Sequence, residues 1–289
     1  HGNFQTKRMN SPAISVLMTT YNREKYVGAA IESVLNSTFK NFELVIVDDR
    51  SKDQTVEIVR EWQAKDNRVK LFINEQNLGD YPNRNQAAAH ATGKYLKYVD
   101  ADDLIYPWGL QILWECMERF PEAGWGLCSL AQDKARPFPF VLDTAEAYRY
   151  HYLGPGLFHK APLSSIIKKE LFNAVGGFEP GRMVGDYEMW HRLALKSPVA
   201  LMPQGVVWYR AHDDQESNVI GEFEEVYRQI SLKHLHSESK PLSPAELHQV
   251  AQRQRKKHLK FAAFNLAKGK FKMAHNSYRK AELTRQITA

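Results

Sequence analysis

Four apolar segments recur along the first hundred residues at a nearly constant spacing. Each is rich in Val, Ile, Leu or Tyr and ends in polar residues, as β-strands do, and segments with helical periodicity separate them. The segments start roughly 26 to 29 residues apart, which is the length of one strand, one helix and their connections. This spacing predicts an α/β fold with a mostly parallel sheet, which binds ligands beyond the carboxyl ends of its strands. The four segments are residues 13–20, 42–49, 68–75 and 94–102.

Three helices are predicted between these strands, at residues 24–38, 53–65 and 83–93. The first is the clearest, because its apolar residues recur at helical spacing and share one face. The third ends near Gly93, which we interpret as its C-cap. The apolar face of the first helix comprises Val27, Ala30, Ile31, Val34 and Leu35.

The composition is that of a globular protein with a sizeable core, since 43% of the 289 residues are hydrophobic and 25% are charged. No apolar run approaches the ~18 residues of a membrane span, and residues 1–12 lack the apolar region of a signal peptide. We interpret residues 1–12 as a disordered leader or tag remnant. Because Cys116 and Cys128 are the only cysteines, no disulfide framework is indicated, and we expect a reducing, cytoplasmic location.

Aspartates gather at the ends of the second and fourth predicted strands. Asp48 and Asp49 close the second, and Asp100, Asp102 and Asp103 close the fourth. Any single aspartate here has a plain structural explanation, because Asp is common in turns and helix caps. Several on one sheet edge are better explained by a D-x-D site, whose carboxylate oxygens would hold Mg²⁺ or Mn²⁺ and, through it, a diphosphate.

The usual glycine-rich phosphate loops are absent. No G-x-G-x-x-G follows the first strand, and no G-x-x-x-x-G-K-[ST] occurs anywhere. A nucleotide would therefore be held by metal and by side chains. Asp49 is one candidate, because an aspartate there could accept a hydrogen bond from a pyrimidine N3–H.

Positive charge is concentrated at the end of the chain. Residues 251–289 carry 11 Lys or Arg and one acid, Glu282, whereas the preceding residues carry 28 basic and 32 acidic side chains. Just before this region, Ser243, Pro244 and Glu246 form the signature of a capping box with Pro at N1. We predict a helix from there to about Ala267, a break at Gly269 and a second helix over residues 271–283, together a helical hairpin.

The apolar residues of this hairpin are expected to pack on another surface. One interpretation is a cap docked on the preceding domain, with a solvated basic face. The other is attraction to an anionic membrane. We favour the first, because the apolar residues do not form one clean stripe, and the acidic body argues against nucleic acid. The apolar residues of the hairpin are Phe261, Phe264, Leu266, Phe271 and Met273.

Three motifs, in order, resemble family 2 of the inverting glycosyltransferases, whose fold is called GT-A. They are "ISVLMTTYNREKYVGAAIESVLNSTFKNFELVIVDDRSKDQT", "NLGDYPNRNQAAAHATGKYLKYVDADD" and "LFNAVGGFEPGRMVGDYEMWHRLA", and the resemblance covers roughly residues 13–215. It implies a GT-A catalytic domain at 13–222, with a nucleotide-binding half at 13–103 and an acceptor half at 104–222. Residues 223–289 would be a helical basic extension.

The resemblance also implies a role for individual residues. It assigns Asp186 as the catalytic base. Metal would be held by Asp102 or Asp103 and by His212. The donor nucleotide sugar would be bound by Thr19, Tyr21, Asp49, Arg84, Asp100, Asp102 and Asp103.

Two positions depart from the family pattern. Arg50 stands where a glycine is common, and Gly185 stands where many members have Glu. The second departure leaves the choice of base between Asp186 and Glu188 less certain.

The expected activity is metal-dependent, inverting transfer of one sugar from a nucleoside-diphosphate sugar, expected to be a UDP-sugar, with Mn²⁺ or Mg²⁺ as cofactor. Such a displacement needs a base on one side of the anomeric carbon and charge neutralisation on the other. The acceptor would be a carbohydrate or a lipid-linked glycan in polysaccharide, glycan or glycolipid synthesis. Peripheral contact with the inner face of the membrane is the alternative to a purely cytoplasmic location, and the oligomeric state is not predicted.

Two other functions remain open. A sugar-nucleotide nucleotidyltransferase would need a glycine-rich loop where "TTYNREKY" stands. A non-catalytic module that binds nucleotide sugars would not need Asp186. A processive polymerase is disfavoured, because the chain has no Q-x-x-R-W motif and no membrane span.

Overall fold

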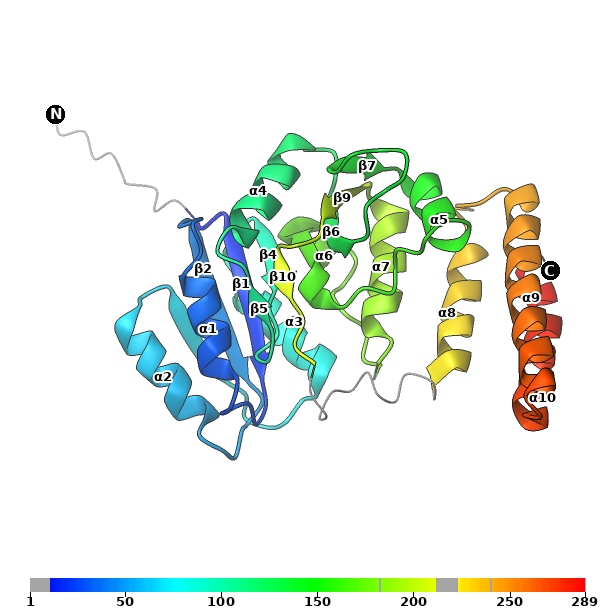
Figure 1. Cartoon of the computed structure of the whole chain (residues 1–289). Helices are drawn as coiled ribbons and strands as arrows, with labels where there is room; N and C mark the ends of the chain where they lie inside the picture. The colour runs from blue at the N-terminus through cyan, green and yellow to red at the C-terminus, as the bar shows by residue number, and fades with distance from the viewer. Residues whose placement is uncertain (1–10, 182, 212–222, 240, 289) are drawn as a thin grey trace.

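A computed structural model describes residues 11–181, 183–211, 223–239 and 241–288. Its centre is an eight-stranded sheet of order β3-β2-β1-β4-β8-β6-β9-β7 (Figure 1). The proposed leader falls almost wholly outside the described residues. His212 and residue 222, the boundary between the two proposed domains, also lie outside the described residues.

The first half of the sheet is parallel, as predicted. β1 pairs in parallel with β2 and β4, and β2 pairs in parallel with β3. All three predicted crossover helices are present, so the α/β prediction is confirmed. The strands are β1 (Ile14–Thr20), β2 (Phe42–Asp48), β3 (Val69–Ile73) and β4 (Tyr95–Tyr98), and the helices are α1 (Val27–Leu35), α2 (Thr55–Lys65) and α3 (Asp80–His90).

The second half of the sheet is mixed, because β8 and β7 run against the other strands. The short strands β5 and β10 form a separate antiparallel pair. The strands are β5 (Leu104–Ile105), β6 (Trp125–Leu130), β7 (Phe140–Leu142), β8 (Ser165–Lys168), β9 (Val199–Pro203) and β10 (Val207–Trp208). The helices are α4 (Gly109–Arg119), α5 (Thr144–Tyr152), η1 (Pro162–Ser164), α6 (Lys169–Ala174), α7 (Gly185–Lys196) and α8 (Glu224–Leu235).

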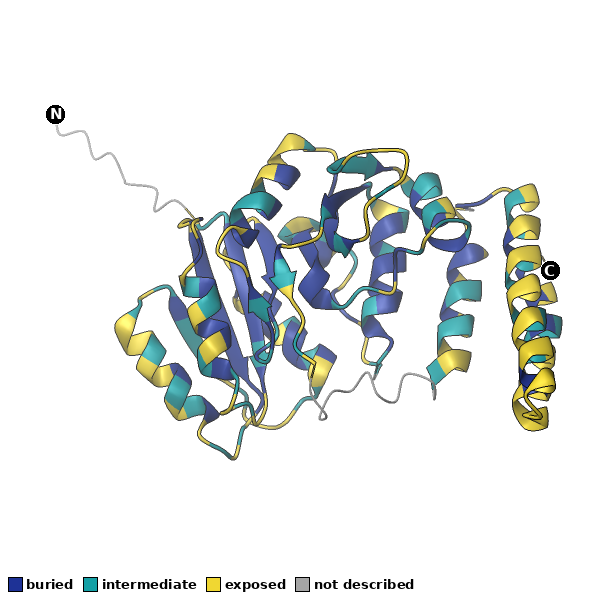
Figure 2. Cartoon of the chain, viewed as in Figure 1, coloured by how far each residue is buried: buried dark blue, intermediate teal, exposed yellow. Residues whose placement is uncertain are grey.

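Helices cover both faces of the sheet, so its central strands are buried on both sides, whereas the edge strands β3 and β7 are only partly buried (Figure 2). Successive residues of a strand point to opposite faces. In β1, Val16 and Met18 therefore join the core under α1, whereas Leu17 joins the core under α3 and α7. This explains the continuous apolar runs in the sequence.

The sequence suggested that Gly93 caps α3, and this prediction is wrong. The cap is Ala91, and the glycine lies two residues beyond it. A Cβ atom on Gly93 would lie 2.7 Å from the backbone nitrogen of Ser15. The glycine is therefore needed because the chain passes close to β1, not because the helix ends there.

The C-terminal helices form the predicted hairpin of α9 (Pro244–Ala267) and α10 (Phe271–Leu283), followed by η3 (Thr284–Ile287). The capping box of Ser243 and Glu246 is present, and Gly269 has a φ of +70° at the turn. The expectation that the hairpin's apolar residues pack on another surface is wrong for this chain by itself: Phe261, Phe264, Leu266, Phe271 and Met273 are all more than half exposed. Among the described residues, no helix is both long and apolar enough to cross a membrane.

Candidate active site

The carboxyl ends of β1, β2 and β4 meet at one edge of the sheet. Thr20 of β1 is paired with Asp48 of β2, and the amide of Val99, just after β4, donates to the carbonyl of Leu17 at 2.9 Å. The polar segments that follow these strands are therefore neighbours in space. This is the convergence that the strand pattern predicts.

Asp48 has a structural role at this edge. Its side chain is fully buried and accepts hydrogen bonds from the Thr20 hydroxyl and the Ser51 amide, both at 2.8 Å. The carboxylate thus ties the end of β1 to the turn after β2. The plain explanation of an aspartate as a turn former holds for this residue.

Asp49 faces the loop that follows β3. Its carboxylate accepts hydrogen bonds from the amides of Leu78 and Gly79 and from the side chain of Asn74, all at 2.8 Å. Only 2% of the residue is exposed. In this conformation the carboxylate organises residues 74–79, so direct contact with a nucleobase requires this loop to move.

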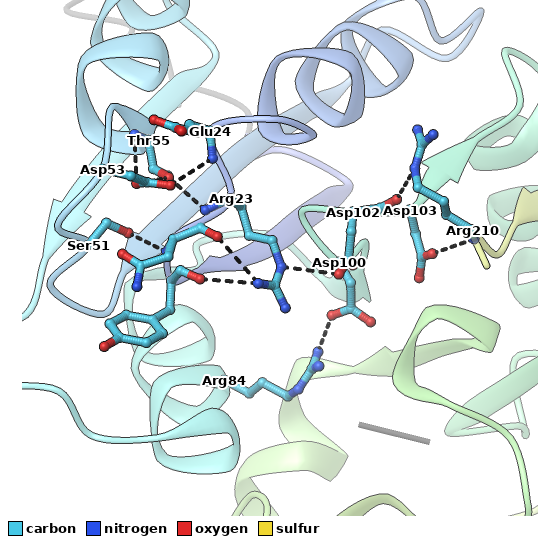
Figure 3. Close-up of polar contacts among 12 residues, drawn as sticks. Arg23, Glu24, Ser51, Asp53, Thr55, Arg84, Asp100, Asp102, Asp103 and Arg210 are labelled. Carbon is cyan, nitrogen blue, oxygen red and sulfur yellow. Dashed lines mark hydrogen bonds and ion pairs between the residues drawn. The ribbon is translucent and has the colours of Figure 1, made fainter. Parts of the chain in front are cut away.

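The three aspartates after β4 are each held by a different arginine (Figure 3). Arg84 Nη1 lies 2.6 Å from Asp100 Oδ1, and Arg23 Nε lies 3.1 Å from Asp102 Oδ2. The backbone amide of Arg210 donates to Asp103 Oδ1 at 2.8 Å, and its side chain donates to the Asp102 carbonyl at 2.7 Å. Arginine side chains thus contact the carboxylates of Asp100 and Asp102, whereas the carboxylate of Asp103 accepts from a backbone amide.

Two of these aspartates, Asp100 and Asp103, have raised pKa values, chiefly because they are buried. Burial raises the pKa of Asp103 to about 7, and the neighbouring negative charge of Asp100 adds to the shift. Burial also raises the pKa of Asp100, although Arg84 opposes that change. This edge of the sheet is therefore an environment that favours added positive charge.

The segment after β1 carries two more of the predicted residues. Tyr21 is 41% exposed and Thr19 is partly exposed, so both are accessible from solvent. On the adjacent turn, Arg50 has a φ of +68°, a conformation that favours glycine, and its guanidinium donates to the Glu75 carbonyl. The backbone therefore keeps the glycine-like geometry of the family pattern although the residue is an arginine.

Asp186 lies in the first turn of α7, and its Oδ1 accepts the Tyr187 amide at 2.6 Å. Burial raises the pKa of Asp186 to about 7, while the Tyr187 amide and the charge of Arg84 oppose the shift. Arg84 therefore acts on both Asp186 and Asp100. A carboxylate with a pKa near neutrality suits a general base.

The neighbouring Gly185 fits closely against Tyr81 of α3. A Cβ atom at this position would lie 2.7 to 2.8 Å from three atoms of the Tyr81 ring. A glutamate, which many family members have here, cannot be accommodated without moving that ring. The departure from the family pattern thus has a local packing cause.

Glu188, the competing candidate for the base, is engaged elsewhere. Its Oε2 accepts from Arg192 at 2.6 Å, and its Oε1 lies 3.3 Å from His234 and 3.6 Å from Lys233 of α8. Burial alone would raise the pKa of Glu188, but the interactions with His234 and Arg192 outweigh it and lower the pKa to about 2. The geometry therefore favours Asp186.

Sequence reasoning missed three residues at this site: Arg23, Asp80 and Arg210. Asp80 accepts from Arg84 Nε at 2.8 Å and so fixes that guanidinium. Each missed residue lies close in sequence to a predicted site residue: Arg23 to Tyr21, Asp80 to Arg84, and Arg210 to His212. This nearness was the available signal.

The fold resembles that of solved glycosyltransferases. S. aureus TarS, solved in complex with UDP-GlcNAc, superposes with a TM-score of 0.66 at 22% identity, covering 96% of this chain and 81% of that one. The mannosyltransferase PcManGT from Pyrobaculum calidifontis, in complex with GDP-Man and Mn²⁺, gives a TM-score of 0.57 at 17% identity, covering 96% and 86%. These likenesses confirm the GT-A fold.

Sequence comparisons also find glycosyltransferases. An uncharacterised glycosyltransferase of Methanocaldococcus jannaschii is 43% identical over 112 residues, which are 38% of this chain and 39% of that protein. The chain thus spans well under half the length of this relative. The model for glycosyl transferase family 2 matches residues 15–176, more than half of the chain. The chain therefore belongs to glycosyl transferase family 2.

Proposed function

We propose that this protein transfers a sugar from a nucleoside-diphosphate sugar to an acceptor hydroxyl, with inversion at the anomeric carbon. The observation that carries the proposal is the position of Arg84, which pairs with Asp100 and also acts electrostatically on Asp186. One side chain thus connects the acidic edge of the sheet to the carboxylate suited to be the base.

The donor is proposed to lie across the ends of β1, β2 and β4. Thr19, Tyr21 and Asp49 would contact the nucleoside, and Arg84 would face the diphosphate. UDP is the nucleotide we expect. The two solved structures support nucleotide sugars as a class, because one holds UDP-GlcNAc and the other GDP-Man with Mn²⁺.

A divalent cation, Mn²⁺ or Mg²⁺, is proposed to be held by Asp102, Asp103 and His212. The donor chemistry fits, because carboxylate oxygens suit hard cations and arginines already contact two of the three neighbouring aspartates. The described residues contain no group of three His, Cys, Asp or Glu side chains arranged to hold a metal, and His212 lies outside them. When bound, the cation would supply neutralisation of the departing diphosphate.

Asp186 is proposed to take the proton of the attacking acceptor hydroxyl. The acceptor oxygen forms a bond to the anomeric carbon as the bond from that carbon to the diphosphate oxygen breaks, and the proton passes to the Asp186 carboxylate. Partial burial of this carboxylate keeps its pKa near 7, so that it is basic enough to accept a proton and largely ionised slightly above neutrality.

The acceptor is proposed to be a carbohydrate or lipid-linked glycan that receives one sugar at each encounter, in polysaccharide, glycan or glycolipid synthesis. We also propose a cytoplasmic location with peripheral membrane contact, and a catalytic domain that ends near residue 222. The rival nucleotidyltransferase has no supporting observation at the β1 end, where Tyr21 and Arg23 occupy the place of a glycine-rich loop.

The test is a screen of nucleotide sugars, with release of nucleoside diphosphate as the signal and Mn²⁺ present or absent. Transfer should occur with at least one UDP-sugar, and NMR of the product should show the anomeric configuration opposite to that of the donor. Retention of configuration, or release of pyrophosphate from a nucleoside triphosphate and a sugar phosphate, would overturn the proposal.

A further inference from the structure

The turn of the C-terminal hairpin combines exposed apolar side chains with positive charge. We call residues 260–273 the hairpin tip. Within it, the exposed fractions are 52% for Phe261, 58% for Phe264, 57% for Leu266, 69% for Phe271 and 53% for Met273. The same residues include Lys260, Lys268, Lys270 and Lys272 and no acid. We propose that the hairpin tip inserts into the surface of an anionic membrane.

The base of the hairpin is fixed to the rest of the protein. Arg149 of α5 pairs with Glu246 at 2.5 Å, Arg253 donates to the Gly154 carbonyl at 2.9 Å, and Val250 is fully buried. These contacts involve the first ten residues of α9, far from its turn. They hold the hairpin in place without covering the tip.

The tip itself is separated from the body by a cleft of about 1860 Å³ between the hairpin and α8. Phe261 and Phe264 line this cleft instead of filling a core. On the other side of the hairpin, Leu266, Phe271 and Tyr278 line a shallow groove of about 440 Å³. Apolar side chains therefore surround the turn on both sides.

This arrangement explains why the sequence shows no single apolar stripe. A helix that lies flat on a membrane needs one continuous apolar face. A hairpin that enters end-on needs apolar side chains around its turn, contributed by both helices. The positions of Phe264 in α9 and Phe271 in α10 match the second geometry.

The charge of the tip selects an anionic lipid surface over a second copy of this chain. Four lysines without an acid repel an identical tip, whereas anionic lipids attract each of them. The surrounding helices reinforce this preference, because residues 251–281 contain ten Lys or Arg and no Asp or Glu.

The direction of the tip relates membrane contact to the acceptor, an argument that rests on the proposed function. In Figure 1 the turn of the hairpin and the carboxyl ends of β1 and β2 lie toward the same lower side of the molecule. The amino end of α7, which carries Asp186, lies on that side as well. A membrane that contacts the tip would therefore lie on the side of the proposed site, where a lipid-linked acceptor could reach it.

The test is co-sedimentation of the full chain with vesicles of phosphatidylcholine alone or mixed with phosphatidylglycerol. We expect binding to the mixed vesicles only, and weaker binding at high salt. The variant Phe264→Ser/Phe271→Ser should lower the partition coefficient by about tenfold or more. Val226→Ser, which removes an exposed apolar side chain from α8, is the control and should have no effect.

The charge component has its own matched pair of variants. Lys268→Gln/Lys270→Gln/Lys272→Gln should lower binding by roughly fivefold per lysine. The control makes the same change in net charge at exposed lysines of the body and should bind nearly as wild type. This control variant is Lys65→Gln/Lys134→Gln/Lys196→Gln.

Three results would overturn the inference: no binding to anionic vesicles, equal binding by the tip variants, or a dimer in solution that the tip variants dissociate. Titration of UDP into the same variants separates this inference from the proposed function. Vesicle binding without any nucleotide binding would leave the tip inference standing and remove the proposed activity.

Discussion

Two carboxylates in one turn of α7 lie on different sides of the helix, in opposite surroundings. Asp186, on the side of the sheet edge, is partly exposed, and its pKa is raised to about 7. Glu188, on the side of α8, is buried among cationic side chains, and its pKa is lowered to about 2. Two acids in one sequence motif can thus differ in pKa, and their neighbours decide which acid is suited to accept a proton at neutral pH.

The largest effect should come from Asp186→Asn. This change keeps the shape of the side chain but removes its ability to accept a proton, so kcat should fall by about a thousandfold. The affinity for the nucleotide should change little, because the proposed donor contacts are made by other residues. Kinetics with saturating donor measure the first quantity, and calorimetry measures the second. Turnover within tenfold of wild type would show that another group is the base.

Glu188→Gln should instead reduce stability. The change removes the charge that Arg192, Lys233 and His234 surround, and breaking such a buried pair should lower the free energy of unfolding by about 3 kcal/mol. Urea denaturation gives this value, and Glu224→Gln, at an exposed ion pair, should cost less than about 1 kcal/mol.

The stability cost of Glu188→Gln should also depend on pH. The folded pKa of Glu188 lies below its ordinary value of 4.5, so its charge stabilises the fold above that pH. The difference between wild type and variant should therefore shrink as the pH falls from about 4.5 toward about 2. A difference that is independent of pH, or absent at neutral pH, would contradict the structural role.

Gly185→Ala tests how the Asp186 side of α7 is held in position. The added Cβ meets the buried Tyr81 ring, and such overpacking should cost about 1 to 3 kcal/mol of unfolding free energy. In a Tyr81→Ala background the same change should be nearly neutral, because the ring is gone. Four urea titrations complete this cycle, and an equal cost in both backgrounds would exclude Tyr81 as the cause.

The smallest effect is the pH dependence of the rate. A base must be ionised to act, and the raised pKa of Asp186 leaves it largely protonated below pH 7. The value of kcat/KM for the free enzyme should therefore rise tenfold per pH unit below about 7 and level off above it. A flat profile between about pH 5 and 8 would mean that the pKa of the Asp186 carboxylate is not raised in the working enzyme.

Much of the first half of the sheet could be predicted from sequence. β2 is buried along its whole length, and such strands give the continuous apolar runs that mark a parallel sheet. The aspartates after β4 were identifiable because charge rarely gathers at the end of a buried strand. In these segments, local pattern and tertiary environment agree.

The parts that could not be predicted depend on contacts between distant segments. Arg210 meets Asp102 across 108 positions of the chain, and no periodicity reports such a pair. Gly93 resembles a helix cap, yet the backbone of Ser15 is what requires it. Phe264 and Phe271 resemble core residues, but within the described residues their side chains remain largely exposed.

The most direct test of the central claim is calorimetric titration of UDP into the purified protein, with and without Mn²⁺. We predict that UDP binds and that Mn²⁺ strengthens its binding markedly, and that Asp102→Asn removes this gain. Absence of UDP binding in both conditions, or binding that Mn²⁺ leaves unchanged, would contradict a metal-assisted nucleoside-diphosphate site at the carboxyl end of β4.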